Sequence, residues 1–248
     1  MKLSGEVFFR AAEERVEKLV DSQWDAIIKV GKELARAIEE DGVIHIFGTG
    51  HSECFAMELV FRAGGLVPMH RMSIQDLALR GELDPERLND PMIERTPEIA
   101  HQLWDLYRVE PKDAFILVSN SGINPTIMEL ATIIKEKGHR LIVVTSMEHS
   151  KAQVSRHESG KKLYEMTPWV IDNCGPEGDA LIEVGSGIKV CSISSITGAY
   201  IAQMLTAEIF KNLKQTGSTP PILISANVNG ADEHNDQVCA RYDGRWNA

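Results

Sequence analysis

Twice in this chain, a short apolar run leads directly into a loop of small polar residues and then into a stretch with helical spacing. The first run covers residues 43–47 and its loop 48–52, while the second run covers 113–118 and its loop 119–124. Buried strands that alternate with helices in this way are typical of a parallel sheet covered on both faces. The pattern therefore predicts a doubly wound α/β fold.

Three further β-rich segments complete a predicted five-stranded sheet, at residues 66–69, 140–145 and 169–172. Helical spacing or helix-start signals predict the connecting helices at 53–63, 96–106, 125–137 and 193–213. The segment 70–90 mixes charges without a clear period, so we expect a loop or short helices there.

The chain begins with a predicted helical extension, residues 1–41, in which apolar residues recur at helical spacing from Phe8 to Ile38. It forms one long helix or two, broken near Gly31. Its apolar face packs either on the chain's own sheet or on a partner subunit. Residues 42–213 are expected to form the sheet core and 214–248 a docked tail, so that 1–248 is a single domain.

The charge balance restricts the partners. The chain has 36 acidic and 26 basic residues, a net charge of −10, and no basic stripe with interleaved aromatics, so we expect no nucleic-acid binding. The first 20 residues contain several charges and no apolar core of a signal peptide, and the apolar runs are too short to span a bilayer. We therefore expect a cytoplasmic protein without membrane contact. Its four cysteines lie far apart without a CxxC pair, so no metal site is expected.

The loop 48–52 reads Gly-Thr-Gly-His-Ser and joins the first strand to a helix. Gly48 and Gly50 allow a tight turn, and the amides at the start of the next helix can face an anion. Ser52 can contribute a hydroxyl to that anion. A purely structural turn, with Ser52 as the helix cap, is the alternative.

The second loop places three hydroxyls and two carboxamides within eight residues at the end of a strand. Small hydroxyls beside free helix-terminal amides suit a phosphate, and the absence of lysine implies binding through neutral donors. A structural capping loop is again the alternative. The candidate ligand residues of this loop are Ser119, Asn120, Ser121, Gly122, Asn124 and Thr126.

Other phosphate-binding and catalytic motifs do not fit. A dinucleotide fingerprint needs a third glycine where Glu53 stands, which disfavours a nucleotide-binding oxidoreductase. The chain also lacks the Gly-Lys-Ser/Thr of a P-loop and the G-x-S-x-G of a serine hydrolase.

The ordered combination of a strand, GxGxS, a helix, and a second strand ending in SxSG closely resembles the SIS (sugar isomerase) domain family. The strand at 140–145 with Ser146, and the serine-rich start of the helix at 193–213, fit the same pattern, so the resemblance covers residues 5–213. Within the family it is most similar to phosphoheptose isomerases and a set of uncharacterised bacterial SIS-domain proteins.

The resemblance implies a flavodoxin-like strand order, 2-1-3-4-5, with both loops side by side at the switch point of the sheet. It also implies a phosphosugar ligand, with Ser119, Ser121 and Thr126 on the phosphate and Ser52 nearby. Family members pair their subunits, so the resemblance implies a homo-oligomer, a dimer or tetramer. We expect a dimer built on the helix at residues 8–38.

Sugar isomerisation requires a base that moves a proton between C1 and C2. The family's helix glutamate falls near Phe61 in this chain, and its last-helix histidine has no counterpart in 193–213. The substitute candidates are Glu58 and Glu53, which lie on different faces of the helix, and His51 in the loop. Asp172 stands at the end of the predicted strand 169–172 and can hold sugar hydroxyls.

The sequence therefore predicts a phosphosugar-binding protein that acts as an aldose–ketose isomerase on a phosphorylated sugar or amino sugar. Glu58 or Glu53 would abstract the C2 proton, and no cofactor is required. Two alternatives stay open, a non-catalytic phosphosugar sensor and a lyase or deaminase acting on an amino-sugar phosphate.

Overall fold

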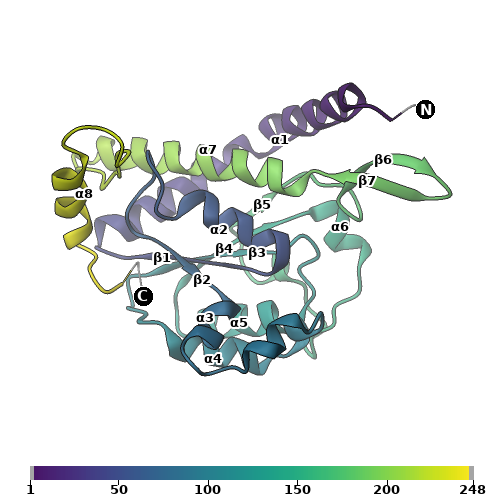
Figure 1. The fold of residues 1–248 in the computed structure, drawn as a ribbon, viewed down its shortest axis with the longest axis horizontal. Helices are drawn as coiled ribbons and strands as arrows, with labels where there is room; N and C mark the ends of the chain where they lie inside the picture. The colour runs from purple at the N-terminus through teal and green to yellow at the C-terminus, as the bar shows by residue number, and fades with distance from the viewer. Residues whose placement is uncertain (1–2, 246–248) are drawn as a thin grey trace.

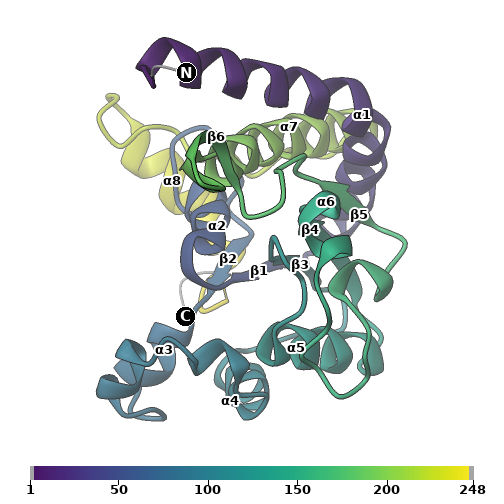
Figure 2. The same cartoon turned by 90° about the vertical axis from the view of Figure 1, so that its right-hand side faces the viewer.

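The computed structural model describes residues 3–245, which form a five-stranded parallel sheet between two layers of helices (Figures 1 and 2). The strand order is β2-β1-β3-β4-β5, which confirms the predicted doubly wound fold with an N-terminal helix. The strands are β1 (Ile44–Gly48), β2 (Met69–Met72), β3 (Ala114–Val118), β4 (Arg140–Thr145) and β5 (Val170–Asp172).

Successive side chains along each strand point to opposite faces of the sheet, so the hydrophobic core is divided into two parts. Ile116 of β3 packs with α1, α2 and α7 on one face, while Phe115 and Leu117 pack with α3, α4 and α5 on the other (Figure 2). Both faces are apolar because both are covered by helices. The α-helices are α1 (Gly5–Glu39), α2 (Glu53–Leu59), α3 (Ile74–Leu79), α4 (Glu98–Leu106), α5 (Pro125–Glu136), α6 (Met147–Ala152), α7 (Ser194–Gln215) and α8 (Ala231–Ala240).

Short 3-10 helices occupy the connections. They are η1 (Gly50–Ser52), η2 (Pro85–Asn89), η3 (Ile93–Arg95) and η4 (Leu163–Glu165). The segment 70–90, expected as a loop or short helices, contains β2, α3 and η2.

The N-terminal extension is one unbroken helix, and Gly31 serves packing instead of ending it. A methyl group at Gly31 would lie 2.6 Å from Cβ of Glu208 on α7. Glycine therefore lets the axes of α1 and α7 approach closely, and these two helices run side by side over the sheet (Figure 1). The chain's own α7 thus covers the buried side of α1.

Two predicted boundaries were displaced. The second strand lies at Met69–Met72, because Leu66 pairs instead with Ile222 in an isolated antiparallel bridge. Pro68 precedes the strand and its carbonyl accepts the amide of Ile44 at 2.8 Å. Helix α2 ends at Leu59, since Val60 is extended and the next residue adopts a positive φ of 46°.

An antiparallel hairpin, β6 (Ala180–Gly185) and β7 (Ile188–Ser192), was not predicted and extends away from the sheet (Figure 1). It leads into α7, whose first turn is capped from a distance. Asp179 accepts the Ser194 amide at 2.9 Å and its hydroxyl at 2.7 Å. The start of α7 is thereby fixed at the carboxyl end of the sheet.

The C-terminal segment lies at the opposite end of the molecule from the hairpin (Figure 1). Tyr242, which follows α8, is fully buried against Val43, Val67 and Leu223. This small apolar cluster covers the amino ends of β1 and β2.

Candidate functional site

The first loop turns tightly where β1 ends. A methyl group at Gly48 would lie 2.9 Å from the carbonyl carbon of Ser52, so a larger residue would push the loop away from α2. Gly50 has a φ of +55°, which glycine adopts without strain. Ser52 does not cap α2, because its side chain makes no capping hydrogen bond. Its hydroxyl is thus available to a ligand, and His51 beside it is exposed.

The second loop is held by its own side chains. Ser119 accepts the amide of Gly122 at 3.0 Å, and Asn120 accepts the side-chain amide of Asn173 at 2.6 Å. The half-buried hydroxyl of Ser121 makes no hydrogen bond to any residue between 3 and 245. Ser121 is therefore a hydroxyl of this loop that is available to a ligand both as a donor and as an acceptor.

A narrow niche brings the two loops together at the carboxyl ends of β1, β3 and β4. Its lining includes Ser52 from the first loop, Asn120 from the second, and Ser195 from the first turn of α7. This is the switch point of the sheet, where β1 has β2 on one side and β3 on the other. The family resemblance placed both loops side by side, and the niche shows that arrangement.

A larger pocket of about 390 Å³ opens on the other side of the first loop. Its walls are the first loop, the residues that follow β2, and the segment that carries η2 and η3. The pocket-lining side chains that matter for chemistry are Thr49, Glu53, Ser73, Gln75, Asp90 and Glu94.

Glu53 is the predicted candidate base that faces this pocket. Its Oε1 atom is buried and has no hydrogen-bond partner, and Arg71 Nη1 lies 3.6 Å away. A buried carboxylate oxygen that accepts no hydrogen bond is costly, so its position suggests a role beyond stability.

Glu58 lies on another face of α2, as the five-residue spacing predicted. Its Oε1 accepts Gln203 of α7 at 2.7 Å and is paired with Arg62. Glu58 lines neither the niche nor the pocket. The structure therefore separates the two glutamates and brings only Glu53 to the ligand loops.

Two predicted ligand residues are used within the protein. Thr126 is fully buried and donates its hydroxyl to the carbonyl of Thr96 at 2.8 Å. Asp172 accepts the amides of Met147 and Cys174 at 3.0 and 2.9 Å, which holds the turn after β5. Both side chains are therefore engaged within the protein, and their role as ligand residues stays a prediction.

Glu94, which was not predicted, connects the two loops. Its carboxylate accepts the Thr49 hydroxyl at 2.5 Å and the Asn124 side-chain amide at 2.7 Å. The carbonyl oxygen of Asn124 accepts Arg156 at 2.7 Å. Glu94 comes from η3, in a stretch without periodicity, so no sequence signal distinguished it from other surface glutamates.

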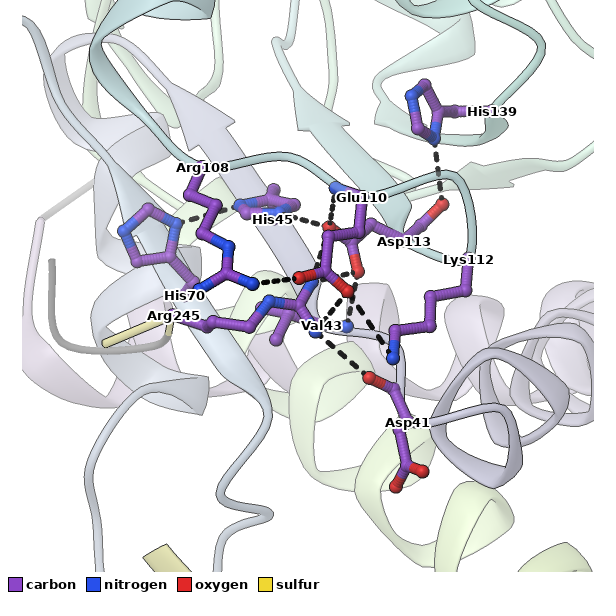
Figure 3. A network of polar contacts seen from close by, with 10 residues as sticks. All are labelled: Asp41, Val43, His45, His70, Arg108, Glu110, Lys112, Asp113, His139 and Arg245. Atoms are coloured by element: carbon purple, nitrogen blue, oxygen red, sulfur yellow. Dashed lines mark hydrogen bonds and ion pairs between the residues drawn. The ribbon is translucent and has the colours of Figure 1, made fainter. Parts of the chain in front are cut away.

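A second polar cluster lies at the amino end of the sheet, away from both loops (Figure 3). Asp113 accepts two hydrogen bonds from Arg245, at 2.6 and 2.8 Å, and lies 3.2 Å from His45 Nε2. Burial alone would raise the pKa of Asp113, but hydrogen bonds from His45, two backbone amides and Arg245 hold it below its usual range. The cluster anchors the C-terminal segment to the sheet.

In the same cluster, His70 Nδ1 lies 2.9 Å from His45 Nδ1. Burial first, and then the neighbouring His45, lower the pKa of His70 to about 3. His70 is therefore neutral at physiological pH.

Residues 3–245 contain no cluster of three or more histidine, cysteine or acidic side chains that could hold a metal ion. Over the same range, no helix is both long enough and apolar enough to cross a membrane.

Comparison with known proteins agrees with the loops and the strand order. A profile of the SIS domain matches residues 7–146. The chain belongs to the SIS domain family. A UPF0309 protein from Geobacillus sp. strain WCH70 is 34% identical over 241 residues, covering 97% of this chain and 96% of the relative. A UPF0309 protein from Listeria monocytogenes serotype 4b is 36% identical over 231 residues, covering 93% and 92%.

Solved structures share the fold of this SIS protein at low sequence identity. A phosphoheptose isomerase from Francisella tularensis has a TM-score of 0.55 at 15% identity, covering 83% of this chain and 96% of that one. A phosphoheptose isomerase from Neisseria gonorrhoeae has a TM-score of 0.51 at 12% identity, with the same coverage. The SIS fold predicted from the two loops is thereby confirmed.

Proposed function

We propose that this SIS protein binds a phosphorylated sugar and interconverts its aldose and ketose forms. The observation that carries the proposal is Glu53, which lines a 390 Å³ pocket beside the first ligand loop and whose buried Oε1 accepts no hydrogen bond within the described chain. A carboxylate that lines a pocket beside ligand-binding loops is a candidate for an acid–base role. The names of the similar phosphoheptose isomerases support the same class of reaction.

The phosphate would be held by neutral donors. Ser52, Ser121 and Ser195 have hydroxyls that no residue of the described chain engages, and Ser52 and Ser195 line the niche between the loops. Hydroxyls and main-chain amides can bind a phosphate without a lysine. A charged sugar phosphate is retained inside cells, so we assign this activity to the cytoplasm.

In the proposed isomerisation, Glu53 acts as the single base. After ring opening, Glu53 takes the proton from C2, and the electron pair forms the C1–C2 double bond of a cis-enediolate. The C1 carbonyl π electrons move onto O1. Return of the proton to C1, with transfer of the hydroxyl proton from O2 to O1, then gives the ketose, and the reverse steps give the aldose. A positioned carboxylate contributes about 10²–10⁴-fold to such a step.

The test is a thermal-shift screen against sugar phosphates, amino-sugar phosphates and the unphosphorylated sugars, followed by NMR of each hit in deuterated water. Isomerisation predicts a product of equal mass that carries deuterium at carbon. A hit that neither exchanges nor reacts would identify a phosphosugar sensor instead, and a product of different mass would identify a lyase or deaminase.

Three variants test which residue acts as the base and which residue contacts the phosphate. We expect Glu53→Gln to bind the hit but lose at least about 100-fold in exchange rate, because the base is gone. Ser121→Ala should weaken binding by about 1–2 kcal/mol through the lost phosphate contact. Glu58→Gln, which alters the contact with Gln203 outside the pocket, should retain exchange. Undiminished exchange in Glu53→Gln would reject Glu53 as the base.

We further propose that the protein pairs with a second copy through α1. Phe9 and Trp24 on this helix are each more than half exposed. Apolar side chains of this size on one helix are typical of a surface that is covered in an assembly.

A further inference from the structure

The two ligand loops follow neighbouring strands but are not bonded to each other directly. The parallel ladder of β1 and β3 ends at the pair Gly48 and Val118. Beyond that pair, no hydrogen bond within residues 3–245 joins loop 48–52 to loop 119–124. The hydrogen bonds that fix the relative position of the loops therefore come from a third part of the chain.

Glu94 supplies that connection. Its two carboxylate oxygens accept one hydrogen bond from each loop, from Thr49 Oγ1 at 2.5 Å and from Asn124 Nδ2 at 2.7 Å. Both donors are uncharged. The two bonds therefore need acceptor atoms in the right places, but they need no counter-charge.

The direction of these bonds is fixed from the second loop. Arg156 has only donor groups, and its Nη1 atom bonds the side-chain carbonyl of Asn124 at 2.7 Å. The amide nitrogen of Asn124 is thereby turned toward Glu94, where an acceptor is required. Arg156 is itself tied to this loop, because its backbone amide donates to the carbonyl of Ile123 at 3.1 Å.

The segment that carries Glu94 has little buried surface of its own. No residue between Leu83 and Ile99 is buried, although this stretch forms one wall of the 390 Å³ pocket. At its carboxyl-terminal end, the carbonyl of Thr96 accepts the hydroxyl of Thr126 at 2.8 Å. Segments with few buried contacts open readily, so the two bonds to Glu94 hold the pocket wall as well as the loops.

We propose that Glu94 is a positioning residue, which keeps the two ligand loops and the pocket wall in register by accepting one hydrogen bond from each loop. It acts through Thr49 and Asn124, and not through contact of its charge with a ligand. The first loop leads directly into α2, so this register also decides where Glu53 lies relative to a phosphate on Ser121. The inference rests on the proposed function for the nature of the ligand, whereas the position of the loops can be measured without one.

Two variants separate position from charge. A glutamine side chain can accept the Asn124 amide through its oxygen and donate through its nitrogen to the Thr49 hydroxyl, which is also an acceptor. We therefore expect Glu94→Gln to keep both connections and Glu94→Ala to lose both. The matched control is Glu86→Ala, at an exposed glutamate on η2 that lies in the same segment and does not line the pocket.

Hydrogen–deuterium exchange of the unliganded full chain, followed by mass spectrometry, measures the loops directly. In Glu94→Ala we expect the amides of residues 48–52 and 119–124 to exchange at least about fivefold faster, because two hydrogen bonds to a charged acceptor are lost. Glu94→Gln and Glu86→Ala should change these rates by less than about twofold. Unchanged exchange in α1 and α7 shows in the same sample that each variant is folded.

Calorimetry with fructose 6-phosphate and with inorganic phosphate then connects the loops to the proposed function. Glu94→Ala should weaken the binding of each probe at least about fivefold, since its donors come from both loops. Glu94→Gln should weaken it by less than about twofold, although the negative charge has been removed.

The outcomes separate the two proposals. Unchanged loop exchange in Glu94→Ala, or equal acceleration in Glu86→Ala, would overturn the positioning inference whatever the protein binds. Normal loop exchange in Glu94→Gln together with a loss of binding as large as in Glu94→Ala would assign the role of Glu94 to its charge, and would also overturn the inference. If the unaltered protein binds neither phosphate while Glu94→Ala loosens both loops, the positioning inference stands and phosphosugar binding loses its support.

Discussion

Asp113 and Arg245 form a buried ion pair, with a fully buried carboxylate and a guanidinium that is 8% exposed. Removing one partner leaves an unpaired charge in the interior, which typically costs about 3–5 kcal/mol. We therefore expect Arg245→Met to lower the free energy of unfolding by roughly 3 kcal/mol, measured by urea denaturation.

The neighbouring Arg241 provides the control for that prediction. It pairs with Asp41 at the surface, where both side chains are about half exposed. Surface ion pairs contribute about 0–1 kcal/mol, so Arg241→Met should change the unfolding free energy by less than about 1 kcal/mol. An equal decrease in the free energy of unfolding in the two variants would show that the burial of Asp113 does not make its ion pair more important for stability.

His70 gives the protein a dependence on pH. Its pKa is about 3 in the folded chain, whereas an unfolded histidine titrates near 6.5. Below pH 6.5 the unfolded state therefore binds a proton that the folded state refuses, and stability falls as the pH falls. The slope reaches about 1.4 kcal/mol per pH unit for this one group.

Replacing His70 with glutamine should flatten that slope between pH 7 and 4.5, a window that stays above the ordinary titration of Asp113. Urea denaturation at several pH values measures it. The residual slope belongs in part to His139, whose pKa burial also lowers. An identical slope in the variant would show that protonation of His70 does not contribute to the pH dependence of the unfolding free energy.

For single residues, the sequence predicted the sites that lie in strand-to-helix loops. It did not predict side chains whose partners are far away in the sequence. The loops with Ser52 and Ser121 were predictable, because glycine and small hydroxyls follow directly from a strand-to-helix turn. Glu94 was not, because its role depends on Thr49 and Asn124, which lie 45 and 30 positions away in sequence.

Helix α1 depends on how closely α7 can approach it. Alanine at Gly31 would place a methyl group 2.6 Å from Cβ of Glu208. The helix propensity of alanine is about 1 kcal/mol better than that of glycine, but overpacking costs about 1–3 kcal/mol. We expect Gly31→Ala to be neutral to destabilising by about 2 kcal/mol in thermal or urea unfolding.

Gly5→Ala, in the same helix, is the matched substitution, since a methyl group there would meet no non-local atom within 4 Å. It should be neutral or stabilising. If both alanines stabilise the protein, close packing of α1 on α7 is not the reason for Gly31.

The sequence predicted the helices and strands whose apolar residues recur at regular spacing and whose ends carry clear capping or turn residues. It did not predict the elements whose position depends on contacts with distant parts of the chain. The hairpin β6–β7 has apolar Ile182 and Val190 opposite each other and a Gly-Ser-Gly turn, a signal that strand analysis could have used. Strand β2 lies further along the chain than predicted, because Leu66 forms an antiparallel bridge with Ile222, which is 156 residues away in the sequence.

For the whole molecule, the proposed pairing through α1 makes one clear prediction. Replacing Phe9 and Trp24 together with aspartate places two charges on the exposed face of α1 and leaves the buried face intact. Sedimentation velocity should then show a smaller species than the unaltered protein. Thermal unfolding at low concentration serves as the control for folding, and an unchanged sedimentation coefficient would exclude this face as the interface.

The side-by-side packing of α1 and α7 has a consequence for synthesis of the chain. Helix α1 is made well before α7, which covers it and begins only at Ser194. At ribosomal rates of about 5–20 residues per second, α1 waits on the order of ten seconds with its apolar face uncovered. The fold therefore closes only after α7 has been translated, and until then the nascent chain exposes apolar surface of α1 that is prone to aggregation.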